Sequence, residues 1–330
     1  MKYTRDILVD LANELVLKRY SKDTKVDAVF LVGSVRPDNA IIESPTDVDL
    51  LVLHNGDIPR ERELVKISPD YHFDIYFEET NYYNNPKDLR TDGWRGWAMW
   101  DPLLLHQTNH FFEYTQSVLR SQFDDPKNII GRVRYFSNRA RKKWAAFDSA
   151  PQKTNPTDYL KAVYDAGNAF ACLSTQPFTK RGFLEQFYQQ ATEMDLPDLI
   201  PLLIDCISES KQPDMIRDSL TEWDHCFTLA TQSFANYTVH PYRINYYRSA
   251  ITRQLQGDLP IAALWPYMLT WSYISQESSE HRTIHRAWDQ VSKMAGYTQD
   301  EMVTRIHKLD AFLESIEDII DQVCSDYGVE

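Results

Sequence analysis

The sequence predicts an α+β protein, in which an N-terminal domain with a mixed sheet and flanking helices is followed by an all-α domain. Strand-like runs occur before residue 80, and from about residue 125 onward the pattern is helical. A chain of 330 residues is also long enough to form two hydrophobic cores. We therefore expect an N-terminal domain of residues 1–122 and a helical domain of residues 123–330.

The N-terminal domain should begin with an amphipathic helix over residues 3–20 and continue with three strands. The apolar residues of this helix recur at roughly helical spacing and are Ile7, Leu8, Leu11, Leu15 and Leu17. The runs Val26–Val32 and Asp47–Leu53 are apolar and β-branched, and His72–Phe77 alternates as a half-buried strand does. Proline, aspartate and asparagine make Arg36–Thr46 a loop between the first two strands.

Three tryptophans, Trp94, Trp97 and Trp100, recur every third residue in the segment 82–101. One helical face could carry them, although two glycines in the segment weaken the helix prediction. Their rings could stack on a base or a sugar, but packing in the core is the preferred interpretation.

The second half of the chain predicts successive helices. Asp125 and Pro126 are typical of a helix start, and later helices are separated by Pro177, Pro197, Pro213, Pro241 and Pro260. Thr298 and Glu301 form a capping box before the last helix. One face of that helix carries Met302, Ile306, Leu309, Leu313, Ile316 and Ile320.

Charge and composition exclude some classes of function. A formal net charge of −13 opposes broad binding to nucleic acid, and it favours a cationic or neutral partner. We expect a cytoplasmic protein with no membrane partner, because no apolar run of about 18 residues and no signal-peptide core occurs. The cysteines Cys172, Cys206, Cys226 and Cys324 lack the spacing of a zinc site, which predicts buried free thiols.

Two aspartates at the head of the second strand are the main candidates for chemistry. Alternate side chains of a strand share a face, so Asp47 and Asp49 should project together while Val48 and Leu50 enter the core. Two carboxylates this close repel each other, and a cation is their natural partner. Carboxylate oxygens without a nearby histidine or cysteine indicate Mg²⁺.

Asp74 and the Gly33–Ser34 pair complete the candidate site. If the strand of Asp74 pairs with that of Asp47 and Asp49, three carboxylates can hold two metal ions about 3.5–4 Å apart. Gly33 ends the first strand, where a glycine allows backbone N–H groups to approach an anion, and Ser34 adds a hydroxyl donor.

Together these segments resemble the signature of the DNA polymerase β-like nucleotidyltransferase superfamily. The resemblance covers Val26–Phe77, although the loop after Ser34 lacks the further glycine of many relatives. It implies that Asp47, Asp49 and Asp74 bind two Mg²⁺ ions with the nucleoside triphosphate (NTP), and that Gly33 and Ser34 contact its phosphates.

The helical half resembles the bundle that closes the cleft in antibiotic adenylyltransferases, small-molecule members of this superfamily. Lys180 and Arg181 resemble the basic start of a helix that reaches the triphosphate there, and a solvated basic pair is the alternative. Asp165 could face a cationic acceptor such as an aminoglycoside, whereas an exposed position on an amphipathic helix is the preferred interpretation.

The resulting hypothesis is an Mg²⁺-dependent nucleotidyltransferase. It would move a nucleoside monophosphate, AMP from ATP, to a hydroxyl of a small acceptor and release pyrophosphate, with Asp74 as a candidate base. The alternatives are the same chemistry on a protein or tRNA, as in toxin–antitoxin relatives, and a nucleotide-binding module without activity.

Overall fold

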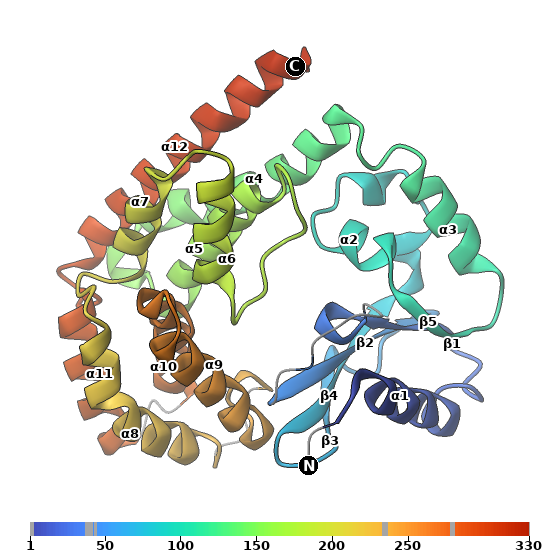
Figure 1. The fold of residues 1–330 in the computed structure, drawn as a ribbon, viewed down its shortest axis with the longest axis horizontal. Coiled ribbons are helices and arrows are strands. Elements are labelled where there is room, and N and C mark those ends of the chain that lie inside the picture. Colours follow the sequence, from blue (N-terminus) through green and yellow to red (C-terminus); the bar gives the residue numbers. More distant parts are fainter. Residues whose placement is uncertain (1–2, 37–41, 43–44, 233–236, 278–280, 330) are drawn as a thin grey trace. The chain divides into compact units, whose positions relative to one another are not determined.

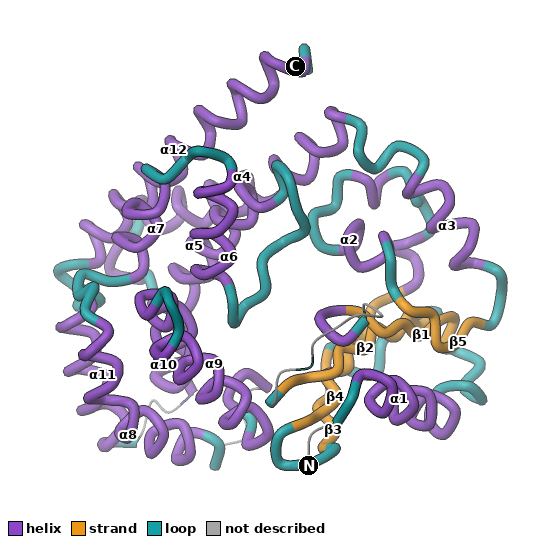
Figure 2. Tube along the Cα trace, in the orientation of Figure 1, coloured by secondary structure: helices purple, strands orange, loops and turns teal. Residues whose placement is uncertain are grey.

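The computed structural model describes residues 3–36, 42, 45–232, 237–277 and 281–329. The chain divides into two compact units, Met1–Asn128 and Ile129–Glu330 (Figure 1). Among the described residues, no helix combines the length and apolarity needed to cross a membrane. The α+β fold class is confirmed, because the first unit carries a mixed sheet and the second is built of helices (Figure 2).

The first unit is organised by a five-stranded sheet of order β3-β4-β2-β1-β5. The strands are β1 Val26–Val32, β2 Thr46–His54, β3 Arg62–Lys66, β4 Tyr71–Glu79 and β5 Leu103–Gln107. The pair β2 and β4 is parallel, whereas the other three pairs are antiparallel. The three predicted strands are confirmed, and the structure adds the edge strands β3 and β5, which were not predicted.

Helices cover both faces of this sheet. On one face α1 (Arg5–Arg19) packs against apolar side chains of β1, β2 and β4. The other face lies under α2 (Arg95–Trp100) and α3 (Phe111–Arg120). Short 3₁₀ helices complete the unit: η1 Gly33–Val35, η2 Thr80–Tyr83 and η3 Asp88–Arg90.

The buried face of α1 differs from the predicted one. Leu8, Ala12 and Val16 are fully or almost fully buried, at a spacing of four residues. Ile7 and Leu17, which the prediction placed on the apolar face, are 38% and 67% exposed. The prediction counted large apolar residues and overlooked the alanine, although the small side chain allows the helix to approach the sheet.

The tryptophan segment packs in the first unit, in agreement with the preferred interpretation of the sequence. Trp97 and Trp100 lie on α2, and their ring centroids are 5.0 and 4.6 Å from that of Phe123. A Cβ on Gly96 would lie 2.3 Å from the carbonyl oxygen of Leu89, so the glycine permits the close contact that the helix makes there. Trp94 remains 36% exposed.

The second unit consists of helices around one hydrophobic core. They are α4 Pro126–Ser149, which begins just before the division, α5 Pro156–Ala171, α6 Phe183–Glu193, α7 Leu199–Ile207, α8 Pro213–Ala230, α9 Ile244–Gln256, α10 Leu264–Glu277, α11 Arg282–Ala295 and α12 Met302–Tyr327, with the 3₁₀ helices η4 Pro151–Lys153, η5 Tyr237–Val239, η6 Pro241–Arg243 and η7 Pro260–Ala263. The predicted apolar face of α12 is buried, and Glu301 accepts hydrogen bonds from the backbone and hydroxyl of Thr298. All four cysteines are buried free thiols, as predicted.

Candidate active site

The parallel pairing of β2 with β4 brings the predicted acidic residues onto neighbouring strands. In this register Asp47 lies beside His72, and Asp49 lies beside Asp74. The alternation along β2 is as predicted, because Val48 and Leu50 are buried in the core beneath α1. The core beneath α1 and the polar site therefore occupy opposite faces of the same two strands.

Three buried side chains on this face form a cluster that fits a metal ion. Asp47, His72 and Asp74 are 6%, 1% and 0% exposed, and their ligand atoms lie within 4.8 Å of one another. Two ligands on opposite sides of a divalent ion stand roughly 4–5 Å apart, so a cation could contact all three after small adjustments. We refer to these three residues as the metal cluster.

His72 corrects one premise of the sequence analysis. The prediction of Mg²⁺ assumed that no histidine lay near the carboxylates, yet His72 stands in register with Asp47. The alternation of β4 contained the necessary signal, because His72 and Asp74 are two residues apart and must share a face. What the sequence did not show was the strand alignment.

The Asp49 carboxylate lies against the end of β1 and is not one of the three residues of the metal cluster. Gly33, the first residue of η1, has φ of +72°. A Cβ built on Gly33 would lie 2.3 Å from Oδ2 and 3.1 Å from Cγ of Asp49. The carboxylate thus lies directly against the glycine backbone. Ser34 follows as an exposed residue of η1, and residues 37–41 and 43–44 of the next loop lie outside the described part of the chain.

Arg62 on β3 pairs with Asp74 through both carboxylate oxygens. Its Nε donates to Oδ1 at 2.5 Å, and its Nη2 donates to Oδ2. The guanidinium carbon also lies 3.9 Å from the ring centroid of Tyr76. The Arg62 side chain is 11% exposed, so this is a largely buried ion pair that partly neutralises the metal cluster. Arg62 was not among the candidate residues, because β3 was not predicted.

The basic pair Lys180 and Arg181 lies in the turn before α6, in the second unit. Trp265 Nε1 donates to the carbonyl oxygen of Lys180 at 2.8 Å, which fixes the backbone of the turn, while the residue itself is exposed. The guanidinium carbon of Arg181 lies 3.8 Å from the ring centroid of Tyr246. A basic helix start therefore exists here, and its contact with a triphosphate stays a prediction.

Asp165 is buried on α5 at 3% exposure, which contradicts the interpretation as an ordinary exposed position. Its Oδ2 lies 2.5 Å from Nζ of Lys143 and 3.5 Å from Nε of Arg139. Two cations of the chain itself therefore already surround this carboxylate. A cationic acceptor would have to compete with them.

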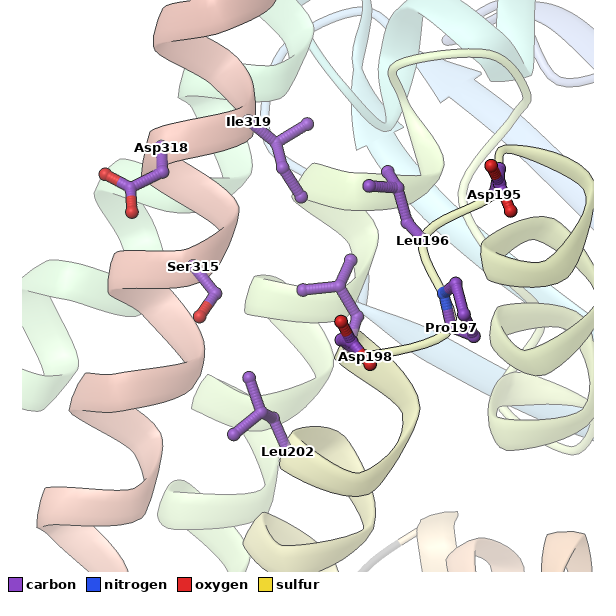
Figure 3. Close-up of a pocket in the computed structure, with 9 residues that line it drawn as sticks. Asp195, Leu196, Pro197, Asp198, Leu202, Ser315, Asp318 and Ile319 are labelled. Carbon is purple, nitrogen blue, oxygen red and sulfur yellow. The ribbon is translucent and has the colours of Figure 1, made fainter.

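Two shallow cavities in the described part of the chain lie away from the predicted site, and none of its residues lines them. The larger, of about 250 Å³, is in the second unit between the start of α7 and α12 (Figure 3). Asp195, Asp198 and Asp318 surround apolar side chains of Leu196, Leu202 and Ile319 there. The smaller, of about 140 Å³, lies in the first unit beside Tyr20 and His54.

Comparison with known proteins adds little to this geometry. No family model matches the sequence, and no curated protein matches it significantly. Among solved structures, a nucleotidyltransferase-like protein from Exiguobacterium sibiricum is similar at 10% identity with a TM-score of 0.31, covering 95% of this chain and 91% of that one. A TM-score this low does not establish a common fold.

Proposed function

We propose that the chain is a metal-dependent nucleotidyltransferase that moves AMP from ATP to a hydroxyl of a small acceptor. The observation that carries the proposal is the meeting of three features at one sheet face. A glycine turn at the end of β1 contacts Asp49, and Asp47 and Asp74 stand on the next two strands. A phosphate-binding turn beside clustered carboxylates is what transfer from a triphosphate requires.

Each part of the site has a distinct task. Asp47 and Asp74 would hold divalent ions together with the nucleotide, and Asp49 would join them after a change of rotamer, since its strand neighbour is Asp74. When bound, such ions polarise the α-phosphate and neutralise the triphosphate. Backbone N–H groups around Gly33 and the Ser34 hydroxyl would donate to the β- and γ-phosphates.

In the transfer, a bond forms between the acceptor oxygen and the α-phosphorus, and the bond to pyrophosphate breaks. The hydroxyl proton passes to a carboxylate at the site. Asp74 is a poor proton acceptor while Arg62 holds both of its oxygens, because that ion pair favours the ionised carboxylate. Release of one oxygen by Arg62 would make Asp74 a competent base.

The candidate ligands in the helical half keep the roles that the resemblance implies. Lys180 is exposed before α6 and would add a point charge to the triphosphate, with Arg181 beside it. The overall charge of −13 supports a cationic acceptor of the aminoglycoside kind. Asp165 would bind such an acceptor by exchanging Lys143 or Arg139 for an ammonium group of the ligand.

The test is pyrophosphate release from each NTP with Mg²⁺ or Mn²⁺, measured with aminoglycosides, other hydroxylated small molecules, tRNA and protein extract. We expect ATP turnover with one small-molecule class, and loss of turnover in Asp49→Asn. Glu79→Gln, at the far end of β4, is the matched control and should retain turnover. Equal turnover in Asp49→Asn and the wild-type protein would refute the proposal.

The other arms of the assay separate the alternatives. Stimulation by tRNA that weakens steeply with salt would indicate a nucleic-acid acceptor. Stimulation by protein extract would indicate a protein acceptor. Tight ATP binding without pyrophosphate release in any arm would indicate a binding module.

A further inference from the structure

The metal cluster contains one nitrogen ligand, and this bears on which ion it selects. His72 is 1% exposed and stands in register with Asp47 on the adjacent parallel strand. It shares its face of β4 with Asp74, two residues along. Both strands are central in the sheet, so the imidazole is held where the two carboxylates converge.

Two properties of the cluster disfavour Mg²⁺. Mg²⁺ prefers oxygen ligands and near-ideal octahedral geometry, whereas imidazole suits first-row transition ions. In addition, Arg62 binds both oxygens of Asp74 and offsets one of the two negative charges in the cluster. This offset weakens the attraction for any divalent ion, so the bond to the imidazole nitrogen supplies a larger share of the binding.

We propose that His72 is a metal ligand and that the cluster Asp47, His72 and Asp74 binds a first-row transition ion, with Mn²⁺ preferred over Mg²⁺. Carboxylates suit Mn²⁺, and imidazole is a better ligand for a first-row transition ion than for Mg²⁺, so Mn²⁺ matches this set of side chains better than Mg²⁺ does. The inference deepens the proposed function, since it names the ion of that same site. It assigns His72 a role that a structural histidine, hydrogen-bonded to an aspartate, would not have.

The experiment is electron paramagnetic resonance on the full chain with Mn²⁺ alone, without nucleotide. Pulsed spectra of the wild-type protein should show nitrogen coupling to bound Mn²⁺. Titration should give an affinity for Mn²⁺ about tenfold or more above that for Mg²⁺ measured by competition. The wild-type spectrum decides the question even where a variant folds poorly.

Variants then identify the nitrogen. His72→Gln should abolish the coupling and weaken Mn²⁺ binding by about 10–100-fold, because losing a ligand costs at least as much as losing its outer-shell partner. His54→Gln is the matched control, since His54 is 5% exposed on β2 but outside the cluster. It should leave the coupling and the affinity unchanged, and circular dichroism should confirm that both variants fold.

The outcomes distinguish this inference from the proposed function. Mn²⁺ bound without nitrogen coupling, or equal affinity for both ions, would overturn the inference even in an active transferase. Nitrogen coupling that disappears in His72→Gln would support it even where no acceptor is ever adenylylated.

Discussion

Replacing Gly33 by alanine tests the close approach between the end of β1 and Asp49. Gly33 has φ of +72°, a region that L-residues adopt at a cost. The added Cβ would also lie 2.3 Å from Oδ2 of Asp49, far inside contact distance. Since Asp49 is held in the β2 ladder, its carboxylate has to rotate away from the turn.

Gly56 provides the matched control for this change. It has φ of +85°, and a Cβ built on it meets nothing within 4 Å. Gly56→Ala should therefore cost only the conformational term, about 1–2 kcal/mol. Gly33→Ala should cost the same plus about 0.5–1.5 kcal/mol for the displaced side chain, or about 1.5–3.5 kcal/mol together.

Denaturant unfolding at fixed pH measures both losses, and pyrophosphate release measures the site. We expect Gly33→Ala to lose about 1 kcal/mol more than Gly56→Ala. It should also lose at least about tenfold in turnover, because the added methyl group crowds the turn that would bind the phosphates, while Gly56→Ala keeps its turnover. Equal losses of stability, combined with unchanged turnover in both variants, would show that the contact between Gly33 and Asp49 has no role in the site.

Three further predictions concern other parts of the chain. Arg62→Met should cost about 3–5 kcal/mol of unfolding free energy in a chelator, because it leaves Asp74 buried without its ion pair, and saturating Mn²⁺ should restore part of the loss. Gly167→Ala should destabilise by about 1 kcal/mol in thermal unfolding despite better helix propensity, since its Cβ would lie 2.4 Å from Cζ of Phe183. Burial, with a smaller contribution from a neighbouring guanidinium, holds the pKa of His240 below its ordinary value of 6.5. Because this pKa is lowered by folding, its stabilising contribution is complete above pH 6.5 and is lost as the pH falls through the folded-state value, so His240→Gln should flatten the acid side of the stability curve.

Each of these has a control or a contradicting result. Arg19→Met breaks an exposed pair with Glu63 and should cost less than about 1 kcal/mol. A similar loss for Arg62→Met, without rescue by Mn²⁺, would contradict the buried ion pair. A more stable Gly167→Ala would contradict tight packing of α5 on α6. A stability curve unchanged in His240→Gln would exclude that histidine as a source of acid sensitivity.

The parts of the fold that sequence predicted are those with strong periodicity. The central strands β1, β2 and β4 read as apolar or alternating runs, and the apolar face of α12 repeats through its whole length. The two strands that were missed lie at the sheet edges. β3 (Arg62–Lys66) carries charged side chains, as edge strands commonly do, and a five-residue segment contains too few residues to show a period.

For the candidate site, the features that depend on one strand alone were predicted, and those that depend on strand pairing were not. Alternation along β2 placed Asp47 and Asp49 on one face, because that depends on one strand alone. His72 and Arg62 enter the site through pairings between strands, whose register a single sequence does not reveal. The orientation of Asp49 toward Gly33 depends on side-chain packing, which a sequence pattern does not predict.

The shared register of β2 and β4 also determines where the chain tolerates insertions. Adding one residue between Asp47 and Val48 would turn every later side chain of β2 to the opposite face, so Asp49 would enter the core beneath α1 and Val48 would leave it. The same addition in the hairpin between Lys66 and Tyr71 would lengthen a surface turn and leave both strands aligned. A register error in β2 would therefore disturb the core and displace the site residues at the same time.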